Sequence, residues 1–280
     1  MVKDKEASII EINRIKEDLA IFKLVPNDEL VPQYKPGQFI TIGMHVPSEN
    51  RPVRRPYTLS SHPENRKYLE LYIRWMRKPT SGKITTQLFN TRVGDKISWL
   101  NPAGAFTINE KLPNGQRDER RIVCLGSGTG LAPFVSYAQH LHEMWDKREI
   151  IILHGASYVD ELAYKELLTN LENESLDMGK DKWDFTYRAT ISRPNEKQNE
   201  SWNGYKGRVE TFLVSKDNEA SDLEKLIGEK LTPENTTFYI CGWQGTIDAS
   251  LNVLVPKGFV IERKKRSDGS FEIKYESYGK

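Results

Sequence analysis

The chain has 280 residues, of which 38% are hydrophobic and 29% charged, and its formal net charge is +2. This balance is typical of a globular protein with one large domain or two ordinary ones. No apolar run is long enough to cross a bilayer and the first residues lack a signal-peptide pattern, so we expect a cytoplasmic protein.

Cysteine content and charge distribution restrict the possible functions. Cys124 and Cys241 are the two cysteines, too few to ligate an iron–sulfur cluster or a structural zinc ion, so we expect no metal centre in this chain. Between Arg51 and Lys96 there are eleven Lys or Arg and three acids. This asymmetry favours an anionic ligand or partner, and a solvated basic surface is the alternative.

The first hundred or so residues predict short strands separated by Pro and Gly turns. Alternating or continuous apolar patterns place these strands at 7–13, 19–24, 38–42, 68–75 and 96–100. Several strands at this spacing without long helices indicate an antiparallel barrel or sandwich.

After residue 119 the pattern changes to alternating strands and helices. We expect strands at 121–125, 149–154, 183–191 and 237–241, and helices up to about 145 and over 160–171. This alternation indicates a parallel α/β sheet, with the domain boundary near residues 108–119. Residues 195–204 and the final segment are expected to be polar loops or tails.

The first parallel strand leads into a glycine-rich turn, GSGTGLAP, at residues 126–133. Glycines at a strand-to-helix turn let backbone amides approach a pyrophosphate at the helix N-terminus. We therefore expect Gly128, Thr129 and Gly130 to bind a nucleotide; a tight turn without a ligand is the alternative.

The turn differs from the six-position Rossmann fingerprint and resembles that of the ferredoxin-NADP reductase superfamily. Three more motifs match in the same order: RPYT at residues 55–58, SGKITT at 81–86 and Cys241-Gly242. The stretches HGASYVDELAYKELL (154–168) and TISRPN (190–195) resemble bacterial-type ferredoxin/flavodoxin-NADP(+) reductases in particular.

The resemblance implies a fold and two cofactors. An N-terminal antiparallel Greek-key β-barrel, residues 1–110, would bind FAD, and a Rossmann-like parallel α/β domain, residues 119–262, would bind NADP(H). Residues 263–280 would form a C-terminal tail near the flavin.

The implied FAD site lies mainly on the RPYT motif. Tyr57 would pack on the isoalloxazine, Thr58 would hydrogen-bond near N5 as a catalytic residue, and Arg55 would pair with the pyrophosphate, a geometrically specific contact. The full set of expected FAD-binding residues is Arg55, Pro56, Tyr57, Thr58, Leu71, Tyr72, Ile73, Gly82, Lys83, Ile84, Thr85 and Tyr275.

Two members of this set have alternatives. Without the resemblance, Tyr72 would be read as a cross-strand aromatic. Many members of the superfamily end soon after an aromatic residue that covers the flavin or its adenine, but this chain continues, so Phe271 and Tyr278 are candidates for this cover beside Tyr275; a frayed terminus is the remaining alternative.

The implied NADP(H) site uses the ends of the later strands. Cys241 would orient the nicotinamide as a catalytic residue, although a free cysteine is commonly a small buried hydrophobe. Cations suit a 2′-phosphate and an acid suits a 2′-hydroxyl, so Ser192, Arg193 and Arg208 favour NADP over NAD. The full set of expected NADP-binding residues is Gly128, Thr129, Gly130, Ser192, Arg193, Arg208, Cys241 and Gly242.

The resemblance implies an oxidoreductase, a ferredoxin (or flavodoxin)-NADP(+) reductase with hydride transfer between NADP(H) and flavin N5 and single-electron exchange with ferredoxin or flavodoxin. These partners are typically acidic, so we expect them to dock on a basic face formed by Arg51, Arg54, Arg74, Arg77 and Lys78. One alternative is the NAD(P)H-dependent reductase component of an oxygenase system. Another is a non-catalytic protein that binds flavin or nucleotide.

Overall fold

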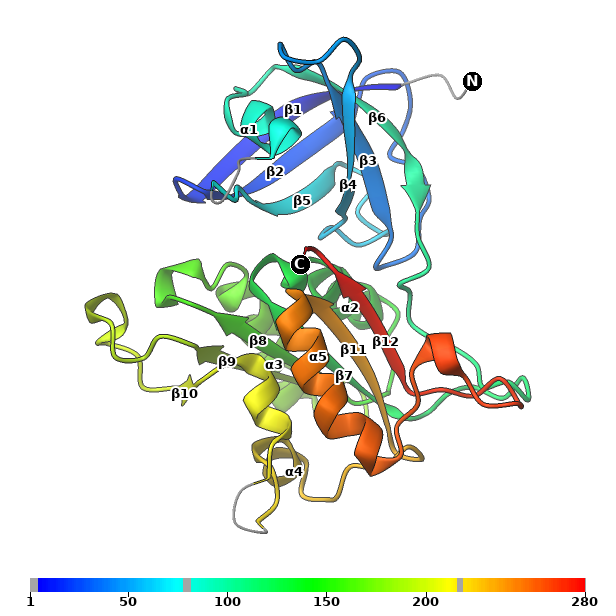
Figure 1. The fold of residues 1–280 in the computed structure, drawn as a ribbon. Coiled ribbons are helices and arrows are strands. Elements are labelled where there is room, and N and C mark those ends of the chain that lie inside the picture. Colours follow the sequence, from blue (N-terminus) through cyan, green and yellow to red (C-terminus); the bar gives the residue numbers. More distant parts are fainter. Residues whose placement is uncertain (1–4, 78–81, 216–218, 280) are drawn as a thin grey trace. The chain divides into compact units, whose positions relative to one another are not determined.

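The computed structural model describes residues 5–77, 82–215 and 219–279. The chain forms two compact units, coloured along the sequence in Figure 1. The first consists of Met1–Thr107 with Val135–Glu143, and the second of Ile108–Phe134 with Met144–Lys280.

The first unit is an antiparallel sheet of six strands in the order β4-β3-β6-β1-β2-β5. Its strands are β1 (Lys5–Lys16), β2 (Leu19–Pro26), β3 (Phe39–Met44), β4 (Val53–Thr58), β5 (Leu69–Arg74) and β6 (Lys96–Ala103). Leu59 pairs with Leu71 across the two outer strands, and the Ser60 amide donates to the Glu70 carbonyl over 2.9 Å. These bonds join the sheet edges, so the expected antiparallel barrel is confirmed.

A short helix, α1 (Lys83–Phe89), completes the barrel core. It buries Ile84, Leu88 and Phe89 in the same cluster as the inward side chains of the strands. The Phe89 ring meets the Phe22 ring edge-on at a centroid distance of 5.6 Å, a favourable aromatic geometry. This packing fixes α1 beside β4 and the end of β5.

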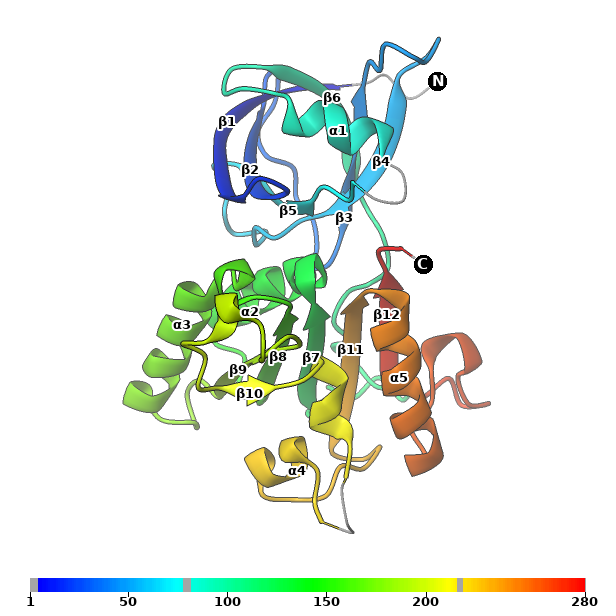
Figure 2. The same cartoon turned by 60° about the vertical axis from the view of Figure 1, so that its left-hand side comes forward.

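The second unit is a sheet of six parallel strands in the order β10-β9-β8-β7-β11-β12. Figure 2 shows its five longer strands side by side. The strands are β7 (Arg121–Ser127), β8 (Ile150–Ala156), β9 (Phe185–Ile191), β10 (Tyr205–Lys206), β11 (Thr236–Gly242) and β12 (Ile273–Ser277). The expected parallel α/β architecture is therefore confirmed.

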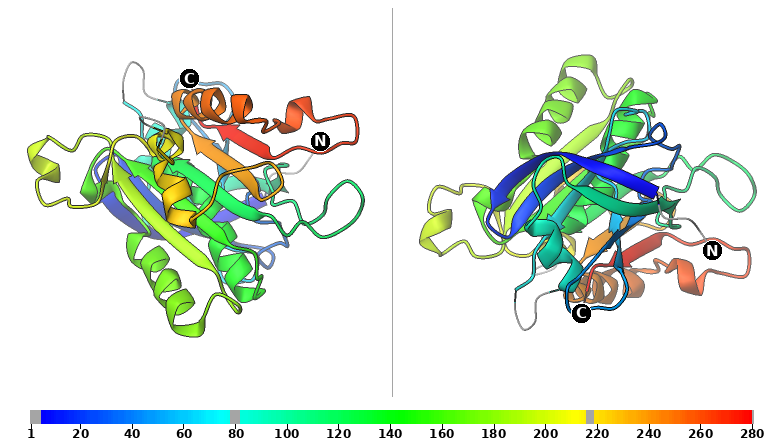
Figure 3. Two further views of the ribbon diagram at one scale, coloured as in Figure 1. Left: turned by 90° about the horizontal axis from the view of Figure 1, so that it is seen from below. Right: turned by 90° about the horizontal axis from the view of Figure 1, so that it is seen from above.

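In the described part of the chain, four α-helices and six short 3-10 helices accompany this sheet. Helix α2 is shared by the two units. The α-helices are α2 (Ala132–Glu143), α3 (Lys165–Met178), α4 (Asp222–Ile227) and α5 (Gln244–Leu254); the 3-10 helices are η1 (Gly128–Leu131), η2 (Val159–Glu161), η3 (Lys197–Asn199), η4 (Val209–Leu213), η5 (Val255–Lys257) and η6 (Glu262–Lys264). In Figure 3, α4 and α5 lie on one side of the sheet and α3 on the other. The residues of β8 are accordingly all buried, which explains its continuous apolar run.

Helix α3 begins five residues later than the sequence pattern predicts. Tyr164, the residue before it, has a left-handed backbone with φ 61°. A right-handed helix cannot pass through that conformation, so the helical pattern of 160–171 becomes the short turn η2 and then α3.

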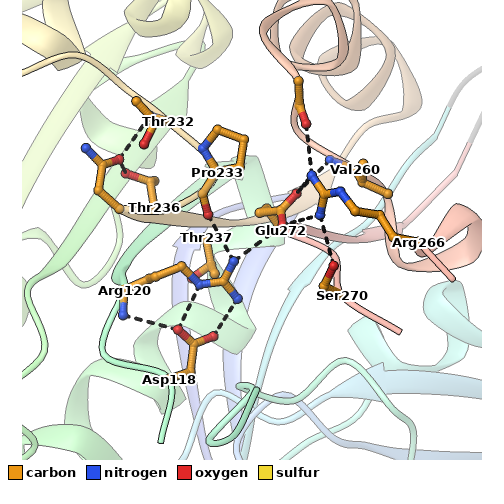
Figure 4. A network of polar contacts seen from close by, with 12 residues as sticks. Asp118, Arg120, Thr232, Pro233, Thr236, Thr237, Val260, Arg266, Ser270 and Glu272 are labelled. Carbon is orange, nitrogen blue, oxygen red and sulfur yellow. Dashed lines mark hydrogen bonds and ion pairs between the residues drawn. The ribbon is translucent and has the colours of Figure 1, made fainter. Parts of the chain in front are cut away.

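The last segment, expected to be a tail, contains strand β12. Glu272, just before β12, is 4% exposed and accepts hydrogen bonds from Arg266 and from the Val260 amide, at 2.6 and 2.9 Å. Arg120 binds Asp118 through two hydrogen bonds of 2.8 and 2.7 Å and lies 3.5 Å from Glu272 (Figure 4). The parallel ladder with β11 joins β12 to the sheet, and these charge contacts link the residue before β12 to Arg120 before β7.

None of the helices in the described ranges combines the length and apolar character needed to cross a membrane.

A buried histidine makes the second unit sensitive to acid. His154 on β8 is fully buried, and its Nδ1 lies 3.0 Å from the Tyr187 hydroxyl. Its Nε2 has no hydrogen-bond partner among the residues that the structure describes. Burial lowers the pKa of His154 to about 3, because the imidazolium form would lose its hydration.

We expect His154 to destabilise the fold as the pH falls below about 6.5. The pKa of His154 is lower in the folded chain than in the unfolded chain. The free energy of unfolding is therefore greatest at pH values above the unfolded-state pKa, and it decreases as the pH falls toward 3. At pH 5 this loss is about 2 kcal/mol. Urea unfolding at pH 7.5 and 5 should show a smaller acid loss in His154→Gln, whereas the exposed control His45→Gln should match the wild type. Equal acid losses in all three proteins would contradict this account.

Candidate active site

The expected flavin motif lies on β4 and the turn after it, at the junction that closes the barrel. Arg55 and Tyr57 pair with Ile42 and Ile40 of β3 and therefore share their face of the sheet. Arg55 is exposed, Tyr57 is half buried and Thr58 is 6% exposed. Among the described residues Arg55 has no hydrogen-bond or ion-pair partner, so its guanidinium is available to an anion.

The structure brings this motif to the second expected flavin motif on α1. The hydroxyl of Tyr57 lies 3.0 Å from Oγ1 of Thr85. Burial raises the pKa of Tyr57, and the Thr85 hydrogen bond opposes part of this rise. The phenol therefore remains protonated at neutral pH and can act as a hydrogen-bond donor.

Side-chain hydrogen bonds of Thr86 and Trp75 stabilise the start of α1. Thr86 Oγ1 donates to the Gly82 carbonyl at 2.9 Å and accepts from Trp75 Nε1 at 3.1 Å. Trp75 was not among the expected site residues, although its place directly after β5 could have suggested it. Lys83 forms an ion pair with Glu49, and Ser81 lies outside the described residues.

The other expected flavin residues lie on β5. Leu71 and Ile73 belong to the barrel core, and Tyr72 between them points to the opposite face. All three are at most 4% exposed. A ligand here would meet the strand backbone or the Tyr72 side chain, and not the side chains of Leu71 and Ile73.

The expected nucleotide residues gather at the carboxyl ends of the parallel strands. After β7 the chain turns through Gly128 with φ 55°. A Cβ on Gly130 would lie 2.2 Å from the Cys241 carbonyl oxygen, and one on Gly242 would lie 2.1 Å from Ser127 Oγ. The loop after β7 and the end of β11 thus touch through glycines that admit no side chain.

Cys241 lies at this contact and is fully buried. Burial raises the pKa of its thiol well above the ordinary value; the nearby Glu276 adds to the rise and a hydrogen bond from the Tyr278 side chain opposes it. The sulfur is therefore a neutral thiol at physiological pH, suited to contact and not to nucleophilic attack.

The two expected phosphate-binding arginines have separate partners. Arg193, after β9, donates to the Tyr158 hydroxyl at 2.8 Å and lies 3.4 Å from a Glu196 carboxylate oxygen. The Arg208 guanidinium lies over the Trp243 ring at 5.1 Å. The Ser192 amide donates to the Ala156 carbonyl at 2.9 Å, which joins the exits of β9 and β8. Tyr158, Glu196 and Trp243 were not among the expected site residues; their places after strand ends are the signal that could have found them.

The three aromatic residues proposed as flavin covers differ in position. Tyr275 lies within β12, half buried against the core of the second unit, with Arg263 5.3 Å from its ring centre. Phe271 precedes β12. Tyr278 follows β12, is 41% exposed, and its amide donates to the Gly242 carbonyl at 2.9 Å. Tyr278 therefore lies beside the end of β11, and Tyr275 packs against the core of the second unit.

Metal-ligating groups do not converge in the part of the chain that the structure describes. No set of three or more His, Cys, Asp or Glu side chains there is arranged to hold a metal ion.

Comparison with known families assigns each unit. An oxidoreductase FAD-binding domain matches residues 6–108, and an oxidoreductase NAD-binding domain matches residues 124–251. The chain therefore contains an FAD-binding and an NAD-binding oxidoreductase domain.

Individual relatives agree with this assignment. A ferredoxin–NADP reductase of Azotobacter vinelandii is 28% identical over 270 residues, 95% of this chain and 94% of the relative. The reductase component of propane 2-monooxygenase from Mycolicibacterium goodii is 26% identical over 93% of this chain and 67% of its own length. The fold is similar to the crystal structure of a ferredoxin NADP+ reductase from Neisseria gonorrhoeae with bound FAD and NADP, with a TM-score of 0.76, 23% identity and 99% of both chains covered.

We expect substitutions of the two C-terminal tyrosines to separate packing from ligand contact. Tyr275→Ala should lower the free energy of unfolding by about 2 kcal/mol, because it removes a half-buried aromatic ring. Tyr278→Ala should change this free energy by less than about 0.5 kcal/mol but shift the visible spectrum of bound flavin. Urea unfolding and absorbance spectra test both, and a spectral shift in Tyr275→Ala alone would contradict the assignment.

Proposed function

We propose, from the premise that the chain belongs to the ferredoxin-NADP reductase superfamily, that it is an FAD-dependent ferredoxin or flavodoxin-NADP(+) reductase. The observation that carries this proposal is the carboxyl edge of the parallel sheet, where Cys241 and the Gly128–Leu131 turn meet through Gly130. The coarser activity, flavin-dependent oxidation or reduction of a nicotinamide dinucleotide, is common to the superfamily.

The residues of the first unit fit FAD. Arg55 supplies an unpaired guanidinium for the pyrophosphate, and Tyr57 supplies a ring and a protonated phenol. Among the described residues, a Cβ on Gly82 would meet Thr85 alone, at 3.5 Å or more, so none of these residues blocks a phosphate group from the backbone at the start of α1. We assign Thr58 to the flavin N5 region and Tyr278 to the cover over the ring.

The residues of the second unit fit a nicotinamide dinucleotide. Apart from its own chain neighbours, no atom of the described residues lies within 4 Å of the Cβ position of Gly128, so its backbone can approach a pyrophosphate closely. The neutral Cys241 thiol would position the nicotinamide by contact. When bound, the flavin exchanges a hydride with nicotinamide C4 and single electrons with a protein partner; the protein's contribution is to hold both groups in reach.

Ser192, Arg193 and Arg208 support NADP(H) as the dinucleotide. Both arginines are exposed and follow the strand ends where the adenosine half of a dinucleotide binds. Guanidinium groups bind a phosphate in a bidentate, charge-assisted manner that a ribose hydroxyl does not match.

The electron-transfer partner is proposed to be an acidic ferredoxin or flavodoxin. Arg51 and Arg54 are exposed near or on β4, whereas Arg74 and Arg77 form ion pairs with Asp18 and Glu17. Lys78 lies outside the described residues. The paired arginines retain less positive potential, so the exposed Arg51 is the strongest candidate for docking. The cytoplasmic location stays a prediction.

The reductase component of an oxygenase system is the second candidate. It is favoured by the similarity over 93% of this chain to a propane 2-monooxygenase reductase component. The non-catalytic alternative is opposed by the presence of Arg55, Tyr57, Thr58 and Cys241 in the matched domains.

The direct test is an anaerobic titration of the purified protein with NADPH and, separately, with NADH. Rapid bleaching of the flavin absorbance by NADPH and slower bleaching by NADH would support an NADP-linked reductase, to be followed by a screen of ferredoxins and flavodoxins. Faster bleaching by NADH would favour the oxygenase-type reductase. A colourless protein that takes up no FAD would refute the proposal.

We expect Arg55→Ala to weaken FAD binding by about 10- to 100-fold, because a charge-assisted hydrogen bond contributes about 1.5 to 3 kcal/mol. The matched control is Arg92→Ala, which removes an exposed arginine elsewhere in the first unit. Flavin fluorescence during titration of the apoprotein measures both affinities. Equal affinities of the two variants would remove Arg55 from the FAD site.

A further inference from the structure

Arg193 does not stand alone at the end of β9 but forms a closed set of contacts with Tyr158 and Glu196. The Arg193 guanidinium donates to the Tyr158 hydroxyl at 2.8 Å, and this hydroxyl donates to Oε2 of Glu196 at 2.7 Å. Oε1 of Glu196 lies 3.4 Å from the Arg193 guanidinium. A carboxylate therefore already occupies part of the guanidinium surface that a phosphate would use.

The loop that carries Glu196 is fixed by a buried asparagine. Asn199 is 1% exposed, and its side-chain amide donates to the Arg193 and Ser157 carbonyls at 2.8 and 2.9 Å. Its side-chain oxygen accepts from the Val159 amide at 2.9 Å. These bonds join the loop after β9 to the exit of β8, so the backbone on both sides of Glu196 is anchored.

The two charges of this pair favour different dinucleotides. An arginine accommodates the 2′-phosphate of NADP, whereas an acid accepts a hydrogen bond from the free 2′-hydroxyl of NAD. Here both kinds of group are in contact. A 2′-phosphate at Arg193 competes with Glu196 for the Nη1 group of the guanidinium and lies close to the negative charge of this carboxylate, which disfavours it. A 2′-hydroxyl meets no such repulsion and gains an acceptor.

Charge in the surroundings does not remove this conflict. Tyr158 is bound to the Glu196 carboxylate, which is the first cause of the raised pKa of the phenol, so Tyr158 stays neutral. Lys197 is the next residue after Glu196 and is exposed without a hydrogen-bond or ion-pair partner among the described residues. The positive charge that contacts Glu196 is that of Arg193 itself.

We propose that Glu196 sets the nucleotide specificity of this chain, by competing with a 2′-phosphate for Arg193 and by accepting the 2′-hydroxyl of the unphosphorylated dinucleotide. This inference rests on the proposed nucleotide site and deepens it. The enzyme uses both NADPH and NADH, and its selectivity for NADPH is limited by this carboxylate.

The test compares Glu196→Gln with Glu200→Gln, an exposed acid of the same loop with no contact to Arg193. The probes are adenosine 2′,5′-bisphosphate and adenosine 5′-monophosphate, which differ by the 2′-phosphate alone, and calorimetry measures their affinities without any electron transfer. Glu196→Gln should bind the bisphosphate about five-fold more tightly than the wild type, with no gain for the monophosphate. Glu200→Gln should match the wild type.

Three results would overturn the inference. Equal bisphosphate affinity in Glu196→Gln and wild type would remove Glu196 from specificity and leave the proposed reductase function intact. An equal gain in Glu200→Gln would assign the effect to net charge. If both the wild type and Glu196→Gln bound the bisphosphate no more tightly than the monophosphate, Arg193 would not be a 2′-phosphate ligand.

Kinetics provides a second readout that a structural role would not move. The ratio of kcat/KM for NADPH to that for NADH, measured by flavin reduction, should rise about five-fold in Glu196→Gln through KM. An unchanged ratio would contradict the proposal. Failure of both dinucleotides to reduce the flavin in the wild type would refute the proposed function itself, and calorimetry would still report on the 2′-phosphate site.

Discussion

The nucleotide-binding edge of the second unit depends on a close backbone contact between the turn after β7 and the end of β11. Gly130 and Gly242 each face a neighbour too near to admit a Cβ. The Trp243 amide donates to Ser127 Oγ at 3.1 Å across the same contact. The proposed pyrophosphate turn and the Cys241 thiol are therefore held at a fixed separation, which is the condition for orienting one end of a dinucleotide relative to the other.

The two arginines proposed for this edge already have partners within the chain. Arg193 binds Tyr158 and Glu196, and Arg208 lies over the Trp243 ring. A dinucleotide must therefore exchange with internal partners, so its affinity is a difference between two sets of contacts. The arginine proposed for the first unit differs, because the Arg55 side chain has no hydrogen-bond or ion-pair partner among the described residues. The two proposed sites therefore differ in how far their arginines are already paired with described residues.

The sequence patterns predict the strands that are apolar runs, such as β7, β8 and β11, and the glycine turn after β7. Strand β4, VRRPYT, is polar, and only the family resemblance places its motif on a strand. The patterns do not predict β12, since Lys274 and Glu276 within it make the strand polar, and the residue before it contacts the distant Arg120. Tyr275 lies on this strand, and which of the C-terminal aromatic residues covers the flavin stays a prediction.

The central claim is that the carboxyl edge around Gly130 holds the nicotinamide dinucleotide. The most direct measurement is the stopped-flow rate of flavin reduction by NADPH in Gly130→Ala, with dithionite reduction of the same sample as reference. The account predicts normal FAD content, normal reduction by dithionite and a rate with NADPH at least about ten-fold below wild type, because the methyl group must displace the Cys241 backbone. A wild-type rate with NADPH would contradict it.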